Sequence, residues 1–256
     1  MGYDEPRFVR SGSGIVALRS DIEVELIDIA ASDVTVARSV MIPSLRESWS
    51  VEVDPDTDRA LINYLIRDGY TVPSEHEMFT FYIEAPVFAW NTVVRHLDAS
   101  YRDESVRCRK LATAFYMPYS DRDIAQSEPS EPLGPGSDVQ REYVEREFVK
   151  AITAACDSYE LLLSRGIATD VARMVLPVNV YSSAYVTVNV YALMNFLSLL
   201  AGTAPHCPCL TREVEIIARK LELIFSSCMP MAYSAFISAS RAISWSAAHS
   251  KARRAE

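Results

Sequence analysis

The 256-residue sequence predicts an α+β fold from two patterns that are mixed along the chain. Apolar residues alternate with polar ones at residues 22–29, 78–83 and 178–188, which is typical of strands because successive side chains point to opposite faces. Elsewhere apolar residues recur every three or four positions, which is typical of amphipathic helices. The sequence contains no internal repeat, so a repeat architecture is not expected.

The first half of the chain is expected to contain two strands and two helices. Residues 22–29 form a half-buried strand, because their apolar positions alternate with acids. Polar residues 54–58 mark the start of a helix, and Gly69 suits its C-terminal end, where glycine tolerates a left-handed backbone. Residues 78–83 place three apolar side chains on one face of a strand, and Pro86 suits the first turn of the helix that follows.

The second half is predicted to be mostly helical. A loop rich in Pro, Ser and Gly covers residues 120–138, and a long amphipathic helix follows at 144–162. The strand at 178–188 has an apolar face and a face of Asn, Tyr, Ser and Thr, which is either a ligand wall or a solvated surface. Helical spacing returns at residues 193–200 and 214–224.

Composition and charge narrow the class of protein. The chain is 49% hydrophobic and 23% charged, as in ordinary globular proteins, and we expect one domain over residues 1–256 with residues 1–20 loosely ordered. The 25 Lys and Arg against 34 Asp and Glu give a net charge of −9. This acidity argues against general binding of a nucleic acid polymer or an anionic membrane.

The cysteines and the apolar segments predict a cytoplasmic location. An odd count of five cysteines favours reduced thiols over a disulfide framework. The first ten residues are mixed and polar, unlike a secretory leader. No uninterrupted apolar stretch approaches the roughly 20 residues that a membrane helix needs.

The densest polar segment, residues 95–110, is locally positive. Five Arg or Lys residues stand against three acids there, which gives +2 within an acidic chain. Because guanidinium groups match phosphate oxygens and hydroxyl groups add donors, this segment suits a small phosphorylated ligand. The alternative is a charged, solvated helix and loop.

Several segments resemble the flavin-dependent thymidylate synthase family (ThyX). The family fingerprint is Arg-His-Arg, seven residues and Ser, and here Arg95-His96-Leu97 is followed by seven residues and Ser105. Four further segments match in collinear order: EHEMFTFYIEAPVF at 75–88, AFYMP at 114–118, VARMVLPVNVY at 171–181 and TVNVYALMNFL at 187–197. The resemblance covers roughly residues 55–120 and 140–240. It implies a ThyX-like fold with a central, mostly antiparallel sheet flanked by helices and a helical C-terminal half.

The resemblance also implies a chemistry. Family members methylate C5 of a pyrimidine nucleotide with FAD as cofactor, methylenetetrahydrofolate as carbon donor and NADPH as reductant. No cysteine attacks the base, so no catalytic nucleophile is expected. The family sites lie between the subunits of a homotetramer, and we expect the same assembly here.

The resemblance assigns roles to matched positions. The expected substrate-binding residues are Thr92, Arg95, Asp103, Glu104, Ser105, Arg107, Arg173 and Leu200. The expected cofactor-binding residues are Arg95, His96, Leu97, Asp103, Asn189, Tyr191 and Asn195.

Some of these positions depart from the family pattern. Leu97 and Tyr191 replace arginines, Thr92 replaces a Gln and Asp103 replaces a Glu. Leu200 replaces the Arg that polarises the pyrimidine. Losing one such donor typically costs on the order of 10²–10³ in rate. His206 or Arg212, in or just beyond the insertion at 202–210, is the candidate replacement, proposed from proximity in the sequence alone.

A metal site is not expected. The segment His206-Cys207-Pro208-Cys209 contains zinc-ligand residue types, but its Cys-x-Cys spacing is short and no second ligand pair follows.

Three functions remain open from the sequence. The leading hypothesis is C5-methylation of UMP, with dUMP also accepted. Members of the family methylate UMP in polyoxin-type nucleoside-antibiotic assembly, and the altered positions Thr92, Asp103 and Leu200 lie, by resemblance, on the nucleotide side. The first alternative is a dUMP thymidylate synthase with an unusual site. The second is a non-catalytic homologue that binds nucleotide or flavin.

Overall fold

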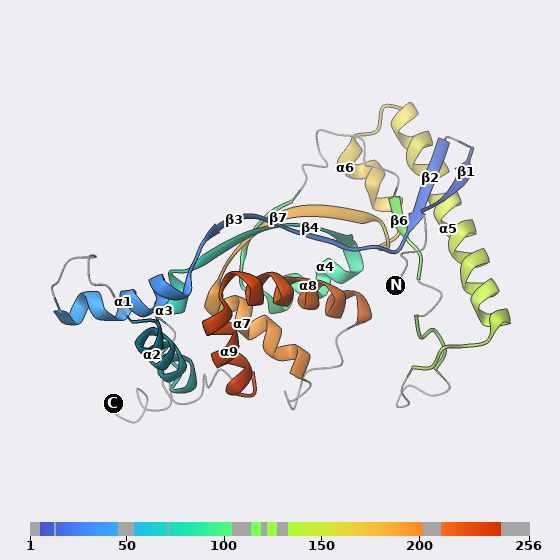
Figure 1. Cartoon of the computed structure of the whole chain (residues 1–256). Coiled ribbons are helices and arrows are strands. Elements are labelled where there is room, and N and C mark those ends of the chain that lie inside the picture. Colours follow the sequence, from blue (N-terminus) through green and yellow to red (C-terminus); the bar gives the residue numbers. More distant parts are fainter. Residues whose placement is uncertain are drawn as a thin grey trace, which may run out of the picture. The chain divides into compact units, whose positions relative to one another are not determined.

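The computed structural model confirms the α+β class (Figure 1). It describes residues 6–12, 14–45, 54–70, 72–103, 114–118, 122–126, 133–201 and 211–241. The chain divides into two compact units, each built from non-contiguous segments. Unit 1 comprises Met1–Glu23, Glu84–Asn91 and Asp103–Ala184, and unit 2 comprises Val24–Ile83, Thr92–Arg102 and Tyr185–Glu256. The organisation as one domain stays a prediction.

Unit 1 contains a small sheet packed against a long helix. Its elements are β1 (Arg7–Ser11), β2 (Gly14–Arg19), β6 (Ala114–Tyr116), α5 (Asp138–Ser164), α6 (Thr169–Ala172) and the 3₁₀ turn η1 (Arg173–Val175). The strand order is β1-β2-β6, antiparallel between β1 and β2 and parallel between β2 and β6. The buried core consists of Val16, Leu18, Phe115, Ile152, Cys156 and Val180.

The expectation of loosely ordered chain over residues 1–20 was wrong for the hairpin of β1 and β2. Ser11 pairs with Gly14, so a two-residue loop containing Gly12 reverses the chain. Val16 and Leu18 alternate with more exposed residues and are 2% and 5% exposed. Their burial stabilises a segment whose Gly and Ser content predicts disorder.

The helix α5 is longer than the amphipathic pattern predicted. Ser137 forms a capping box with Gln140: the Ser137 hydroxyl accepts from the backbone N–H of Gln140, and the Gln140 side chain accepts from the backbone N–H of Ser137. Gly166 follows the last turn with φ of +74°, a conformation that glycine adopts without strain.

A four-stranded sheet lies mainly in unit 2, in the order β3-β4-β7-β5. The strands are β3 (Glu23–Ala30), β4 (Met78–Pro86), β5 (Ser100–Asp103) and β7 (Tyr181–Asn189). Thr80 lies opposite Thr187 with hydroxyls 3.1 Å apart, and Tyr82 contacts Tyr185 with ring centroids 6.0 Å apart. Residue numbers rise from 80 to 82 along β4, whereas the facing residues of β7 fall from 187 to 185. The central pair of strands is therefore antiparallel, as expected.

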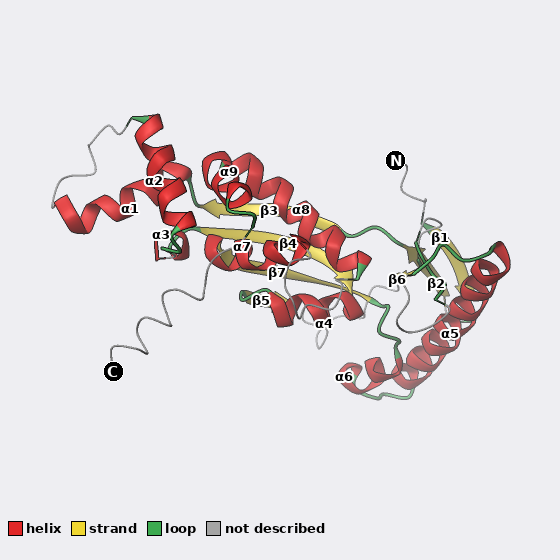
Figure 2. Cartoon of the chain, turned by 90° about the horizontal axis from the view of Figure 1, so that it is seen from below, coloured by secondary structure: helices red, strands yellow, loops and turns green. Residues whose placement is uncertain are grey.

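One face of this sheet carries the core of unit 2. Phe79, Phe81 and Ile83 are each 0% exposed, so the predicted alternation in β4 is confirmed. Figures 1 and 2 show α7 (Val190–Ser198), α8 (Arg212–Cys228) and α9 (Pro230–Ser238) on one side of the strands. The ring of Phe79 meets that of Phe225 in α8 edge to face at 6.3 Å, which places these helices on the buried face.

The remaining helical elements surround this layer or follow its strands. They are α1 (Asp33–Leu45), α2 (Pro55–Arg67), α3 (Val72–Glu75), α4 (Val87–His96) and η2 (Leu199–Ala201). Asp54 caps α2 by accepting from the backbone N–H of Thr57, and Gly69 beyond its end has φ of +73°, as predicted. In the described part of the chain, no helix has both the length and the apolar character needed to cross a membrane.

Candidate active site

The C-terminal end of α4 presents the first half of the fingerprint. Arg95 and His96 occupy the last turn and are exposed, and within the described residues neither side chain forms a hydrogen bond or ion pair. Leu97 is 1% exposed and packs inside unit 2. Two of the three fingerprint side chains are therefore available to a ligand in this unit.

The turn after Arg95 and His96 is held in place by Tyr101. Its hydroxyl donates to the backbone carbonyl of Leu97 at 2.6 Å. Burial, with a smaller contribution from Asp98, raises the pKa of Tyr101 to about 12, so the phenol remains a donor at neutral pH. This bond fixes the chain directly after the exposed Arg95 and His96.

The junction of β7 and α7 carries the expected flavin residues of the second half. Asn189 is the N-cap of α7, and its Oδ1 accepts from the backbone N–H of Ala192 at 2.7 Å. The side-chain amide N–H groups of Asn189 are not used in the cap, so they remain free to donate. Tyr191 and Asn195, four residues apart and half-buried, lie on the same side of α7.

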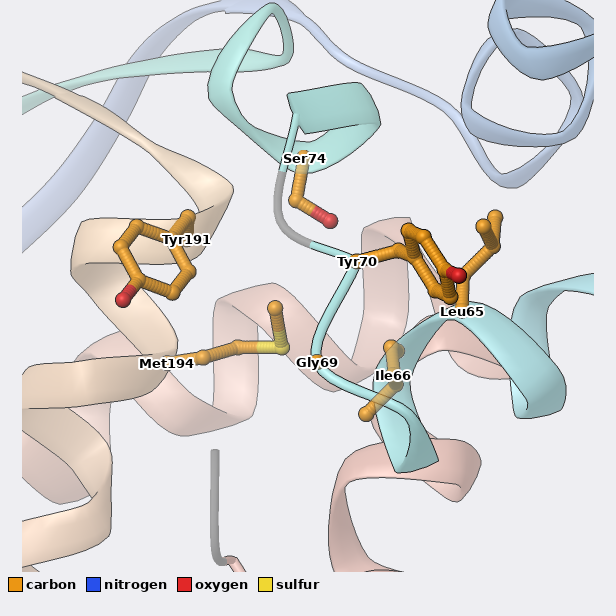
Figure 3. Close-up of a pocket in the computed structure, with 7 residues that line it drawn as sticks. All are labelled: Leu65, Ile66, Gly69, Tyr70, Ser74, Tyr191 and Met194. Carbon is orange, nitrogen blue, oxygen red and sulfur yellow. The ribbon is translucent and has the colours of Figure 1, made fainter. Parts of the chain in front are cut away.

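Tyr191 lines a small recess in unit 2 (Figure 3). Figure 3 shows Tyr191 and Met194 on one side, Tyr70 on the other and the hydroxyl of Ser74 directed towards the space between them. The lining residues are Leu65, Ile66, Gly69, Tyr70, Ser74, Tyr191 and Met194. The recess encloses only about 10 Å³, which is room for about one water molecule, so it is too small to hold a ligand by itself.

Tyr70 and Ser74 were missed by the sequence analysis. They lie directly upstream of the matched segment 75–88, but no local pattern relates them to Tyr191, more than 100 residues later. The packing of α2 and α3 beside α7 brings them together, and such long-range proximity has no signature in a single sequence.

The remaining expected residues are distributed over both units. In unit 2, Thr92 in α4, Leu200 in η2 and Arg212 at the start of α8 are half-buried. In unit 1, Asp103 at the end of β5 and Arg173 in η1 are exposed. Glu104, Ser105, Arg107 and His206 lie outside the described residues.

The described residues contain no cluster of three or more His, Cys, Asp or Glu side chains that could hold a metal ion. The segment 206–209, which contains zinc-ligand residue types, is outside them.

Comparisons with known proteins define the class. Residues 25–231 match the family model described as "Thymidylate synthase complementing protein". The flavin-dependent thymidylate synthase of Streptomyces avermitilis is 36% identical over 229 residues, which cover 86% of this chain and 92% of that protein. The enzyme of the same name from Tropheryma whipplei is 38% identical over 224 residues, covering 85% and 92%.

Two solved structures extend the comparison. Both are crystal structures of PolB, a UMP/dUMP methylase from Streptomyces cacaoi, bound with 5-Br UMP or 5-Br dUMP. Their TM-scores are 0.78 and 0.79 at 35% and 37% identity, and the matches cover 88% of this chain and 98% of PolB.

The chain therefore belongs to the flavin-dependent thymidylate synthase family. The expected class, a flavin-dependent enzyme that methylates C5 of a pyrimidine nucleotide, is confirmed, and so is FAD as the cofactor of the family. These relatives support the enzyme class over the non-catalytic alternative.

Proposed function

We propose that this protein transfers a one-carbon unit to C5 of UMP, and of dUMP less efficiently, with methylenetetrahydrofolate as carbon donor and NADPH as reductant. The observation that carries the proposal is the similarity to a UMP/dUMP methylase over 88% of the chain, at TM-scores of 0.78 and 0.79. Thr92, Asp103 and Leu200 differ from the family pattern on the side where, by resemblance, a 2′-hydroxyl must be admitted.

The side chains present fit a flavin. Arg95 and His96 offer an exposed cation and ring, Asn189 offers free amide N–H groups, and Tyr191 offers an aromatic face. Bound FAD would supply the electron transfer that converts the attached carbon into a methyl group. The protein contributes binding and orientation, because no cysteine nucleophile is needed in this family.

The nucleotide is held mainly through its phosphate in this proposal. Arg173, Arg107 and Ser105 supply guanidinium and hydroxyl donors, which form strong charge-assisted bonds to phosphate oxygens. Asp103 and Glu104 place carboxylates beside the same ligand. The exposed position of Arg173 is consistent with its use as a ligand group.

We further propose a homotetramer with sites between subunits. Apolar side chains flank Arg173 on the surface, including Val171, Met174 and Val178 at 48%, 77% and 61% exposed. Exposed apolar residues gathered around a ligand residue suit a protein interface. Light scattering tests this proposal, and a mass near that of one 28.6 kDa chain would contradict it.

The cellular setting also remains a proposal. We place the enzyme in the cytoplasm and its product in nucleoside-antibiotic biosynthesis. Free thiols at Cys156 and Cys228 agree with a reducing compartment.

Release of tritium from 5-labelled UMP tests the reaction, because methylation displaces the hydrogen at C5. We expect release that depends on FAD, NADPH and methylenetetrahydrofolate, and that is faster from UMP than from dUMP. Brisk release from dUMP with none from UMP would favour an unusual thymidylate synthase instead, an alternative supported by the names of the curated relatives.

A further inference from the structure

The carboxyl end of α9 has a strained backbone. Ser240 and Arg241 both have φ of +57°, and in the part of the chain that the structure describes they are the two residues other than glycine with positive φ. Their N–H groups donate to the carbonyls of Ile237 and Phe236 at 2.9 and 3.0 Å, which is the bonding of a Schellman cap. Glycine normally occupies a left-handed position, so two L-residues in succession cost free energy. Such strain persists where surrounding contacts hold it, and it often marks a functional position.

The side chain of Arg241 provides contacts that hold this strained end. Its Nη2 donates to Oε1 of Glu222 in α8 at 2.5 Å, and the hydroxyl of Tyr233 donates to the same oxygen at 3.1 Å. Glu222 is 7% exposed, so its carboxylate depends on partners within the protein. The ion pair therefore fixes the guanidinium of Arg241 against α8.

The same guanidinium also reaches the end of α7. Its Nη1 donates to the backbone carbonyl of Leu197 in a long hydrogen bond of 3.5 Å. The last turn of α7 contains no basic residue of its own, although the carbonyls at a helix end carry partial negative charge and favour a cation. Arg241, 44 positions later in the chain, supplies that cation.

The end of α7 forms one part of the candidate active site. Asn189 caps the start of the helix, whereas Leu200 lies in η2, which follows the last turn of α7 directly. In the proposed function the start of α7 meets the flavin and Leu200 meets the nucleotide. A shift of the last turn would therefore move Leu200 and leave Asn189 in place.

We propose that Arg241 is a positioning residue for the nucleotide: it holds the last turn of α7 against α8 and thereby fixes Leu200. This inference rests on the proposed function, which supplies the nucleotide side of the site. The planar guanidinium suits this role, because it bonds Glu222 and Leu197 through two different nitrogens. A lysine ammonium is a compact point charge, which keeps the pair with Glu222 without bridging to Leu197.

The alternative is an ion pair that only stabilises unit 2. In that case every loss in the network lowers the free energy of unfolding, and UMP binding follows stability. The two roles therefore separate in variants that keep the ion pair and change the contact with α7.

The test compares the KM for UMP, measured by tritium release, with stability in urea. Arg241→Met should raise the KM for UMP about tenfold, which corresponds to the free energy of one charge-assisted hydrogen bond. FAD affinity, measured by flavin fluorescence, should not change, because the start of α7 is untouched. Arg241→Lys should keep the stability of the unmodified protein and still raise the KM for UMP nearly as much.

Two further variants serve as controls. Tyr233→Phe removes a bond to Glu222 that does not involve α7, so it should lower stability and leave the KM unchanged. Arg219→Met breaks the exposed ion pair with Glu215 on α8 and should change neither quantity. An equal rise in the KM in Tyr233→Phe and Arg241→Met would overturn the inference. If Arg241→Met does not fold, Arg241→Lys decides, and an unchanged KM in that variant contradicts the inference.

Calorimetry of UMP binding to the FAD-loaded protein separates this inference from the proposed reaction. If no nucleotide is methylated, but UMP binds more weakly to Arg241→Met and Arg241→Lys than to the unmodified protein, the reaction fails and the role of Arg241 stands. If UMP is methylated with the same KM in all variants, the reaction stands and the role of Arg241 fails.

Discussion

The carboxylate of Glu77 is a single buried group that joins several elements of unit 2. It is 5% exposed, and its Oε2 accepts from the backbone N–H of Ser32 at 2.8 Å and the hydroxyl of Thr35 at 2.7 Å. Its backbone carbonyl accepts from Val190 N at 2.9 Å, at the start of α7. One residue at the head of β4 therefore ties the start of α1 to the helix that carries Asn189, Tyr191 and Asn195.

We predict that Glu77→Ala lowers the free energy of unfolding by about 1–3 kcal/mol, because partly buried donors lose their acceptor. Urea unfolding measures the change. Glu77→Gln keeps an acceptor oxygen and should lose less, and the exposed Glu25→Ala serves as the control. A loss in Glu77→Ala no larger than in the control would contradict this role.

Tyr101 makes a pH dependence testable at the residue scale. Burial raises its pKa to about 12 in the folded protein, above the ordinary tyrosine value of about 10, so the folded state holds the proton more tightly than the unfolded state. The stability contributed by this group is complete below pH 10 and is lost as the pH rises towards 12. Urea unfolding of Tyr101→Phe should show a shallower loss over this interval than the unmodified protein, and identical slopes would exclude the effect.

Leu200 cannot donate a hydrogen bond, so another group must polarise the pyrimidine in the proposed reaction. Arg212 is half-buried at the start of α8, and His206 lies outside the described residues. If one of them supplies the missing donor, its replacement by Ala should lower kcat for tritium release about 10²-fold, the usual cost of one such donor. Unchanged kcat in both His206→Ala and Arg212→Ala would dismiss the hypothesis.

At the scale of elements, the cap of α7 combines two roles that one substitution can separate. Asn189 accepts through Oδ1 in the cap, whereas its amide N–H groups are the part expected to meet the flavin. Asn189→Asp preserves the acceptor and removes the donors. We predict unchanged stability in urea with weaker FAD binding, measured by flavin fluorescence.

Asn189→Ala is the matched comparison, because it removes both atoms. It should lose about 1 kcal/mol of stability as well as flavin affinity. Unaltered FAD binding in Asn189→Asp would show that this residue acts only as a helix cap.

Helices and strands with a regular apolar period or a clear capping signal were predictable from the sequence. Helices and strands whose burial depends on tertiary contacts, without such a local pattern, were not. The alternation in β4 and the capping signals of α2 identified both elements, because their burial follows a regular period. The apolar residues of α1 and α9 show little helical periodicity, and neither helix was predicted. In α9 the apolar residues occupy more than one side of the helix. The hairpin of β1 and β2 was missed because its Gly and Ser content outweighed a short alternation.

Only those residues of the candidate site that lie in the matched family segments could be predicted from the sequence. The collinear family segments predict Arg95, His96 and Asn189 as site residues, and these roles stay predictions. The structure adds the exposure of Arg95 and His96 and the capping bond of Asn189. The recess lined by Tyr70, Ser74 and Tyr191 was not predicted from the sequence. It arises where α2, α3 and α7 come together, and such contacts depend on the tertiary fold.

At the scale of the whole molecule, the proposed function requires groups from both units and from segments far apart in sequence. Arg95, His96 and Asn189 belong to unit 2, and Arg173 belongs to unit 1. In the proposed homotetramer each site is built from several subunits, so a single chain need not complete a site by itself.

A crystal structure of the assembled protein with FAD and UMP tests this account most directly. We predict the UMP phosphate within hydrogen-bond distance of Arg173, Arg107 and Ser105, and the flavin against Arg95, His96 and Asn189. A nucleotide bound elsewhere, with these side chains turned to solvent, would contradict the account.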